Sequence, residues 1–361
     1  MTKNIALCFD GTGNVVRATG NTNVLLLFKR LTFDPESQLT YYDPGVGTFS
    51  SGGAWTPAAQ WFSLKLGQAF GSGMRENLEQ AYTFLINNWN PGDRIYIFGF
   101  SRGAYTARAV AGLLRTVGIM RPGADNLVRY AVANYARRSS KWQRNEWMQS
   151  GQFGSLMSRR VDGKVTVSVE YLGIWDTVKA PGLLRRSMTW PWTRQLPNVK
   201  AGRHAVSIDE KRRPFREYLV EKDKGGDRIE EVWFAGIHSD VGGSYMDPPN
   251  LGDITLNWIV QGARDAGLSF DDDPPWPVLT PEHAEGPIHK MGRIWALASY
   301  RRRPIPAGAK VHASVRARIE KEPRYARRQI PSDVQWAEPN WLPSLPQPAA
   351  GPSPSRVVHH S

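Results

Sequence analysis

The most constraining part of the chain is the stretch Arg94–Leu114, which reads RIYIFGFSRGAYTARAVAGLL. Its first residues are apolar and β-prone, whereas its last residues are rich in Ala, Val and Leu and favour a helix. At the junction, residues 99–103 (GFSRG) form a G-x-S-x-G pattern. The serine of such a turn has a strained backbone, and Gly99 and Gly103 avoid the clashes that a Cβ would make. The pattern predicts a nucleophilic Ser101 at a sheet edge; the alternative is an ordinary serine in a tight turn.

The rest of the chain alternates predicted strands with predicted helices. Apolar runs predict strands over 4–9, 40–43, 165–174 and 229–237. Apolar periodicity and capping residues predict helices over 21–31, 74–88, 203–210 and 251–266. Elements alternating in this way indicate the α/β class, with a mostly parallel, α/β-hydrolase-like sheet covered by helices on both faces.

We expect a single domain over residues 1–330. Segments rich in Gly, Pro, Trp or basic residues predict cap or lid insertions at 48–73, 125–160 and 180–202. The proline-rich residues 331–361 predict an extended or disordered tail.

The composition excludes several classes of protein. The chain has one cysteine, Cys8, and no apolar run that approaches the about 20 residues needed to span a bilayer. Its N-terminus lacks the long apolar stretch and cleavage site of a secretory signal. We therefore expect a cytoplasmic protein without disulfides, whose export would need a signal-independent secretion system.

The net charge of +13 is concentrated in residues 301–328, where ten Lys or Arg residues accompany two Glu residues. A basic surface of this kind attracts anionic membrane lipids, an acidic protein partner or nucleic acid. No zinc-knuckle, RNP-type or helix-turn-helix pattern accompanies the charge, so we do not expect nucleic acid as a partner. The chain also lacks H-E-x-x-H and paired C-x-x-C motifs, so no metal site and no cofactor are expected.

Two further predicted strands end in residues that suit Ser101. Asp176 follows the strand over 165–174, and His238 follows the strand over 229–237. Serine, acid and histidine in this chain order are typical of α/β-hydrolases. His238 is suited to take the serine proton, and Asp176 to orient the imidazole. Asp240 is the alternative acid, but it lies only two residues from His238 and is better placed to brace the loop with Gly242 and Gly243.

A glycine-rich turn, residues 10–14 (DGTGN), follows the first predicted strand. It lacks the lysine of a P-loop and the second aspartate of aspartate-based phosphatases. We predict that it supports the site through Asp10 and Asn14. Gly11 or Thr12 would give one N–H group to an oxyanion hole, and Arg102 the other. The alternative is a structural turn in which Asp10 caps its own backbone.

Four sequence blocks together resemble a known family. CFDGTGN, GFSRGAYTAR, GIWDTV and GIHSDVGGSY, in this order, look like the signature blocks of the DUF2235 family, which includes the type VI secretion lipase effectors of the Tle1 class. The resemblance implies an α/β-hydrolase fold and an esterase that cleaves phospholipid esters with A1 or A2 specificity. It assigns the nucleophile to Ser101, the acid to Asp176 and the base to His238.

The resemblance also implies a lipid or other ester substrate and either an immunity or a secretion partner. Two other hypotheses remain. One is a binding protein that kept a hydrolase fold without activity. The other is a metal-dependent phosphoesterase that uses Asp10, Asp176, His238 and Asp240.

Overall fold

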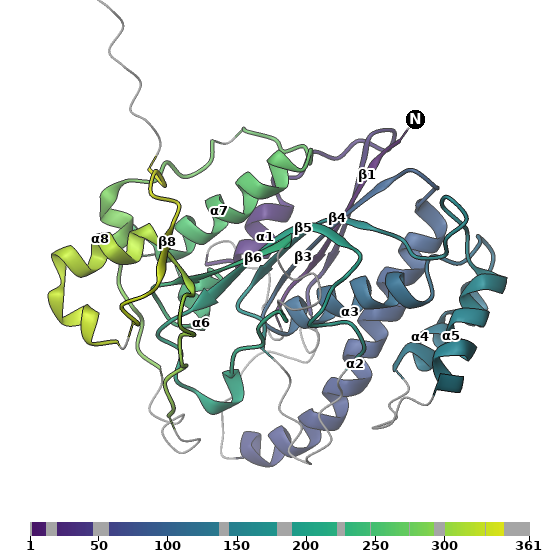
Figure 1. Ribbon diagram of the computed structural model, residues 1–361, viewed down its shortest axis with the longest axis horizontal. Coiled ribbons are helices and arrows are strands. Elements are labelled where there is room, and N and C mark those ends of the chain that lie inside the picture. Colours follow the sequence, from purple (N-terminus) through teal and green to yellow (C-terminus); the bar gives the residue numbers. More distant parts are fainter. Residues whose placement is uncertain are drawn as a thin grey trace, which may run out of the picture.

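The computed structural model is built around one eight-stranded sheet with helices on both faces (Figure 1). It describes residues 2–11, 20–45, 58–136, 144–178, 190–221, 228–245, 247–273, 275–291, 300–328 and 330–342. The strands are β1 (Asn4–Phe9), β2 (Gln38–Asp43), β3 (Arg94–Phe100), β4 (Val169–Trp175), β5 (Val199–Ser207), β6 (Ile229–Phe234), β7 (Lys310–His312) and β8 (Gln335–Ala337). The α-helices are α1 (Asn23–Phe28), α2 (Ala58–Asn88), α3 (Arg102–Thr116), α4 (Val128–Ala136), α5 (Arg144–Met157), α6 (His238–Val241), α7 (Leu251–Asp265) and α8 (Ala313–Lys321).

The strand order is β2-β1-β3-β4-β5-β6-β7-β8, and every pair of neighbouring strands is parallel. This confirms the predicted α/β class with a parallel sheet. The register brings the carboxyl ends together, since Phe9 pairs with Gly99, Phe100 with Trp175 and Trp175 with Ala205. The residues that directly follow β1, β3 and β4 therefore lie at one edge of the sheet.

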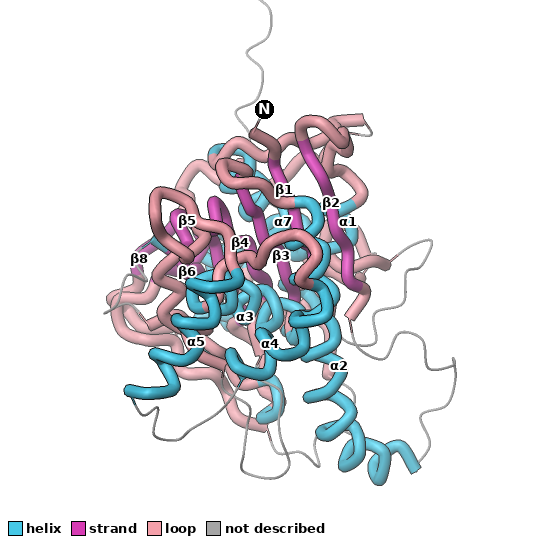
Figure 2. The backbone as a smooth tube through the Cα atoms, turned by 90° about the vertical axis from the view of Figure 1, so that its right-hand side faces the viewer, coloured by secondary structure: helices cyan, strands magenta, loops and turns pink. Residues whose placement is uncertain are grey.

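Alternate residues of the strands enter two separate cores. In β1, Ile5, Leu7 and Phe9 pack with α2, α3 and α4 on one face. Ala6 and Cys8 pack with α1 and α7 on the other face. Figures 1 and 2 show α2, α3 and α4 together on one side of the sheet and α1 and α7 on the opposite side. Burial raises the pKa of the Cys8 thiol, as expected for a small apolar core residue.

The structure differs from the sequence predictions at three elements. Residues 203–210, predicted as a helix, begin within β5, where they pair with β4 and β6. Helix α2 begins at Ala58 rather than at 74, so more than half of the segment predicted as a loop or lid at 48–73 is helical. Glycines 67, 71 and 73 weaken the helical signal of that segment. The predicted tail from 331 also starts too early, because Gln335–Ala337 pair with β7 as β8.

The remaining predicted insertions are described only in part. Residues 46–57, 137–143 and 179–189 lie outside the described residues, as does the tail from 343. Of the 125–160 segment, α4 packs against α2 and α3 and buries Val132 and Tyr135. Trp190, from the 180–202 segment, is buried against Tyr135 with their ring centroids 5.7 Å apart. Within the described parts of the chain, no helix has both the length and the apolarity to cross a bilayer.

Candidate active site

Ser101 lies at the sharp turn between β3 and α3. Its backbone has φ 59° and ψ −120°, a region that a residue with a side chain seldom occupies. A Cβ on Gly99 would lie 2.6 Å from the Gly103 carbonyl oxygen, and a Cβ on Gly103 would lie 2.2 Å from that of Phe9. Both glycines are therefore required for this turn, as the pattern predicts. The Ser101 N–H donates to the Trp175 carbonyl (3.0 Å), which ties the turn to β4.

The structure brings Ser101, His238 and Asp176 into one hydrogen-bonded chain. The Ser101 hydroxyl donates to His238 Nε2 (2.8 Å). His238 Nδ1 donates to Asp176 Oδ2 (2.5 Å). All three residues are buried. Ser101 and His238 lie 137 positions apart in the sequence, and His238 and Asp176 lie 62 positions apart. The order of contacts is that of a nucleophile, a general base and a carboxylate that fixes the base.

His238 is held by aromatic rings and by the loop around α6. Its imidazole stacks on Phe100, with centroids 4.6 Å apart, and meets the edge of Phe215 at 4.9 Å. A Cβ on Gly242 would lie 2.0 Å from the Phe100 ring, and Gly243 has φ +76°. The two glycines therefore let the α6 loop close against Phe100, which fixes the ring plane of His238.

The electrostatics of the site favour an ionised acid beside a neutral base. Burial raises the pKa of Asp176, but Arg303 and His238 outweigh it and hold this pKa well below its usual range. Burial lowers the pKa of His238, and the opposing effect of Asp176 only partly offsets it. The imidazole is therefore uncharged at neutral pH, the form in which it accepts a proton.

Arg303 is the partner that the sequence did not reveal. Its side chain is 3% exposed, and Nη1 lies 2.5 Å from Asp176 Oδ1. The residue lies 127 positions from Asp176, within the basic segment 301–328 that is interpreted from the sequence as a charged surface. Three consecutive arginines at 301–303 gave no signal that one of them is buried.

The Asp10 carboxylate supports the adjacent sheet edge. Its Oδ2 accepts hydrogen bonds from Thr22 Oγ1 (2.6 Å) and from the Tyr42 hydroxyl (2.8 Å). Its Oδ1 accepts from the Gly11 N–H (2.6 Å). In this structure the Gly11 N–H is thus directed at Asp10. Residues 12 and 14, the other predicted members of this loop, lie outside the described residues.

Asp240 does not contact the imidazole of His238. Its Oδ2 accepts from the Ile237 N–H (2.9 Å), and its Oδ1 accepts from His289 Nδ1 (2.6 Å). His289 Nε2 also donates to Asp247 (2.9 Å). Asp240 therefore braces the α6 loop, the second of the two roles that its spacing suggests.

The four residues of the metal-dependent alternative are not gathered around one point. Asp10 and Asp240 bind separate partners, whereas Asp176 and His238 bind each other. Among the residues that the structure describes, no group of three or more His, Cys, Asp or Glu side chains has the arrangement of a metal site.

His204 serves the fold behind Asp176. It is buried in β5, where Nδ1 contacts Glu231 (2.8 Å) and Nε2 accepts from the Thr177 N–H (3.3 Å). The Thr177 backbone directly follows Asp176. This histidine therefore helps to hold the backbone that presents Asp176.

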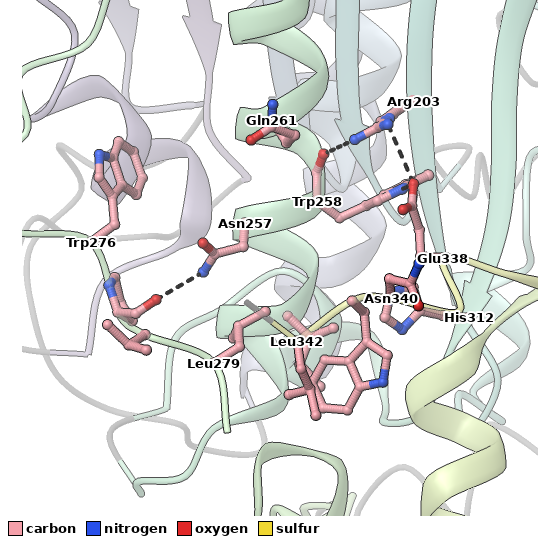
Figure 3. Close-up of a pocket in the computed structure, with 14 residues that line it drawn as sticks. Arg203, Asn257, Trp258, Gln261, Trp276, Leu279, His312, Glu338, Asn340 and Leu342 are labelled. Atoms are coloured by element: carbon pink, nitrogen blue, oxygen red, sulfur yellow. Dashed lines mark hydrogen bonds and ion pairs between the residues drawn. The ribbon is translucent and has the colours of Figure 1, made fainter. Parts of the chain in front are cut away.

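A cavity of about 410 Å³ lies elsewhere, between α7, β5, β7 and residues 338–342 (Figure 3). Its lining includes Trp258, Trp276 and Trp341, and Arg203 and Glu338 form an ion pair within it. None of its lining residues belongs to the chain of Ser101, His238 and Asp176. The cavity therefore gives no direct support to a substrate site at Ser101.

The chain is similar to known proteins in its sequence and in its structure. Residues 3–262 match the family model described as "T6SS, Phospholipase effector Tle1-like, catalytic domain". The chain is 33% identical over 221 residues to "Uncharacterized protein YEL023C" of Saccharomyces cerevisiae, which covers 60% of this chain and 32% of the yeast protein.

Two solved structures are similar to the chain. One is an uncharacterized protein from Pseudomonas aeruginosa, with a TM-score of 0.45 and 21% identity, covering 78% of this chain and 48% of that one. The other is the Tle1 effector bound to the VgrG spike of the type 6 secretion system, with a TM-score of 0.39 and 19% identity, covering 69% and 52%. The chain thus spans between about a third and about half of the length of these relatives.

The match to the family model runs from before β1 into α7 and includes Ser101, Asp176 and His238. It covers well over half of the chain, so the chain belongs to the family of Tle1-like phospholipase effector catalytic domains.

Proposed function

We propose that this protein is a serine hydrolase that cleaves carboxylic ester bonds of lipids, with a phospholipase of A1 or A2 type as the specific activity. One observation carries the proposal: the Ser101 hydroxyl donates to His238 Nε2 while Nδ1 of the same ring donates to Asp176. Neutral serine is a poor nucleophile, and a neutral imidazole at 2.8 Å is the base that it requires.

The proposed reaction has two halves. His238 takes the proton of Ser101 as Oγ attacks the ester carbonyl carbon, and it then gives that proton to the leaving alcohol. The resulting acyl-serine is hydrolysed by a water molecule that His238 deprotonates in turn. Asp176 keeps the imidazole in one tautomer and stabilises the imidazolium that forms in each half.

The oxyanion that forms in each half needs two N–H donors. Arg102 is the first residue of α3, and the N–H groups of a helix's first turn have no acceptor within the helix. For the second donor the loop over residues 10–14 is the candidate. Because the Gly11 N–H donates to Asp10, the Thr12 N–H is the better choice of the two.

The lipid substrate is proposed from family membership and from charge. The matched family is one of phospholipase effectors, and a net charge of +13 favours contact with anionic headgroups. One of the similar structures is a Tle1 effector bound to VgrG, so a secretion-spike partner and export by a type VI system belong to the same proposal. A role as a secreted effector would also imply an immunity partner that protects the producing cell.

The test uses the purified protein and its Ser101→Ala variant on a panel of phospholipids with different headgroups. The wild-type protein should release fatty acid and lysophospholipid, and the mass of the lysophospholipid should identify the cleaved position. Ser101→Ala should lose this activity while retaining its circular dichroism spectrum. Ser269→Ala is the matched control, because Ser269 is exposed and its hydrogen bonds to Thr32 and Gln38 are made by its backbone.

Absence of product from the wild-type protein would favour the inactive binding protein instead. Activity that persists in Ser101→Ala but disappears in chelator would favour the metal-dependent phosphoesterase.

A further inference from the structure

Arg303 is buried at the site although it carries a permanent charge. It belongs to the segment that begins at residue 300 and leads to β7, and its side chain is only 3% exposed. Buried arginines persist in proteins only where charges and carbonyl groups compensate them. The partners of Arg303 therefore indicate what it does.

The guanidinium of Arg303 faces Asp176 with both of its terminal nitrogens. Nη1 donates to Asp176 Oδ1 (2.5 Å) and Nη2 donates to Oδ2 (3.0 Å). Nη1 also donates to the Ser207 carbonyl (3.1 Å), and Nη2 to the Phe215 carbonyl. Nε lies 3.8 Å from Glu217 Oε2. Such a two-pronged contact fixes the carboxylate in its plane as well as neutralising it.

Each oxygen of Asp176 is thereby held from two sides. Oδ2 accepts from His238 Nδ1 and from Arg303, whereas Oδ1 accepts from the Ser207 N–H (2.9 Å) and from Arg303. A buried carboxylate without a permanent cation would be stabilised chiefly by a protonated His238. An imidazolium cannot accept the proton of Ser101, so without this cation a larger fraction of the protein would be in an inactive protonation state at a given pH.

We propose that Arg303 is a positioning residue of the site: it keeps Asp176 ionised and correctly oriented while His238 is neutral, so that the imidazole meets Ser101 as a free base. The inference rests on the proposed function for its effect on turnover. Its effect on His238 does not depend on that function.

The charges around His238 determine the sign of the expected change. Asp176 and Glu210 raise the pKa of His238, whereas Arg303 lowers it. Glu210 is itself paired with Arg212 (2.7 Å), and Glu217 lies on the far side of Arg303. His204, behind Asp176, is a further titratable group that interacts with the carboxylate. Removal of Arg303 deletes a positive charge that opposes protonation of His238, so the pKa of His238 should rise.

The experiment measures the titration of His238 in Arg303→Met and in the wild-type protein by NMR of ¹³C-labelled histidine. His238→Gln identifies the resonance. We expect the midpoint to rise by about one pH unit or more in Arg303→Met. The acidic limb of kcat/KM should move in the same direction, and kcat at neutral pH should fall by about tenfold to a hundredfold.

Two further variants keep the test decisive. Arg318→Met removes a buried arginine that donates to the Ala284 and Gly286 carbonyls, and it should leave the His238 midpoint unchanged. Arg303→Lys retains the charge and carries the test if Arg303→Met does not fold. Its midpoint should stay near that of the wild type while kcat falls, because one ammonium cannot hold both oxygens in the plane.

An unchanged His238 midpoint in Arg303→Met, or a wild-type kcat in a folded Arg303→Lys, would overturn the inference. The proposed function fails separately. The wild-type protein could hydrolyse no ester while the titration midpoint of His238 still rises in Arg303→Met. In that case the proposed esterase function is wrong, but the inferred action of Arg303 on His238 stands.

Discussion

Ser101 occupies a strained backbone conformation that its two neighbouring glycines make possible. The turn directs Oγ toward His238. The same geometry leaves no room for a Cβ at Gly103 against the carbonyl of Phe9. A single added methyl group therefore tests the turn without touching any atom of the proposed chemistry.

Gly103→Ala places a Cβ 2.2 Å from the Phe9 carbonyl oxygen, and β1 is paired on both sides, so it cannot move away. We expect the free energy of unfolding to fall by about 3 kcal/mol. Gly151→Ala, in α5, meets nothing within 4 Å and should instead raise it by about 0.5–1 kcal/mol. Urea denaturation measures both, and equal changes at the two positions would contradict the packing described for the turn.

The protonation of His238 should also determine the acidic limb of the pH dependence of kcat/KM. Its pKa lies below the ordinary 6.5 because of burial, and only the neutral imidazole accepts the serine proton. Activity should therefore persist below pH 6.5 and fall only as the pH drops through the folded-state pKa. The measurement is kcat/KM for a p-nitrophenyl ester from acidic to neutral pH. An acidic limb with its midpoint above 6.5 would show that His238 is not the base, or not buried as described.

At the scale of elements, the position of His238 depends on how α1 and α7 hold the α6 loop. Asn23, at the start of α1, is buried, and its Nδ2 donates to the Val241 carbonyl (3.2 Å), the Gly252 carbonyl (3.0 Å) and Thr255 Oγ1 (3.0 Å). One amide thus joins three helices around the loop that carries His238.

Asn23→Ala removes one donor from these buried acceptors, although the Thr255 hydroxyl still reaches the Val241 and Gly252 carbonyls. We therefore expect the free energy of unfolding to fall by about 1–2 kcal/mol. Asn88→Ala is the matched control: its Nδ2 donates only within α2, to the Phe84 carbonyl (2.8 Å), and the expected loss is about 0.5 kcal/mol. Thermal and urea unfolding of the two variants compare them. A loss in Asn23→Ala no larger than that in Asn88→Ala would refute the role of Asn23.

The elements also show where sequence patterns fail. β1, β3, β4 and β6 were predicted because buried parallel strands read as continuous apolar runs. β5 was not, because His204 is polar yet buried, with Glu231 and the Thr177 N–H supplying its partners. Glu231 lies on β6 and Thr177 lies just after β4, so a local pattern shows neither partner. β8 has three residues, too few for any periodicity.

At the scale of the molecule, the parallel sheet explains why the site could be predicted at all. Ser101 and Asp176 each follow the last residue of a strand, and the sheet places those strands side by side. Residue type and strand order therefore sufficed to assemble Ser101, Asp176 and His238. Arg303 enters the site through tertiary packing from 127 positions away, and no spacing in the sequence could signal that contact.

The whole-molecule charge leads to a prediction about membranes. Arg303 and Arg318 are buried and paired, but the net charge remains +13. We expect the protein to sediment with vesicles that contain phosphatidylglycerol at low salt, to dissociate at high salt, and not to bind pure phosphatidylcholine vesicles. Equal binding to both kinds of vesicle, or binding that salt does not weaken, would contradict an electrostatic approach to the lipid surface.

The central claim is that His238 activates Ser101 as a nucleophile. The most direct measurement is mass spectrometry of the protein after reaction with a fluorophosphonate, which modifies activated serines. The account predicts a single adduct on the peptide that contains Ser101, and no adduct in Ser101→Ala or His238→Gln. An unmodified wild-type protein, or an adduct that persists in His238→Gln at the wild-type rate, would contradict it.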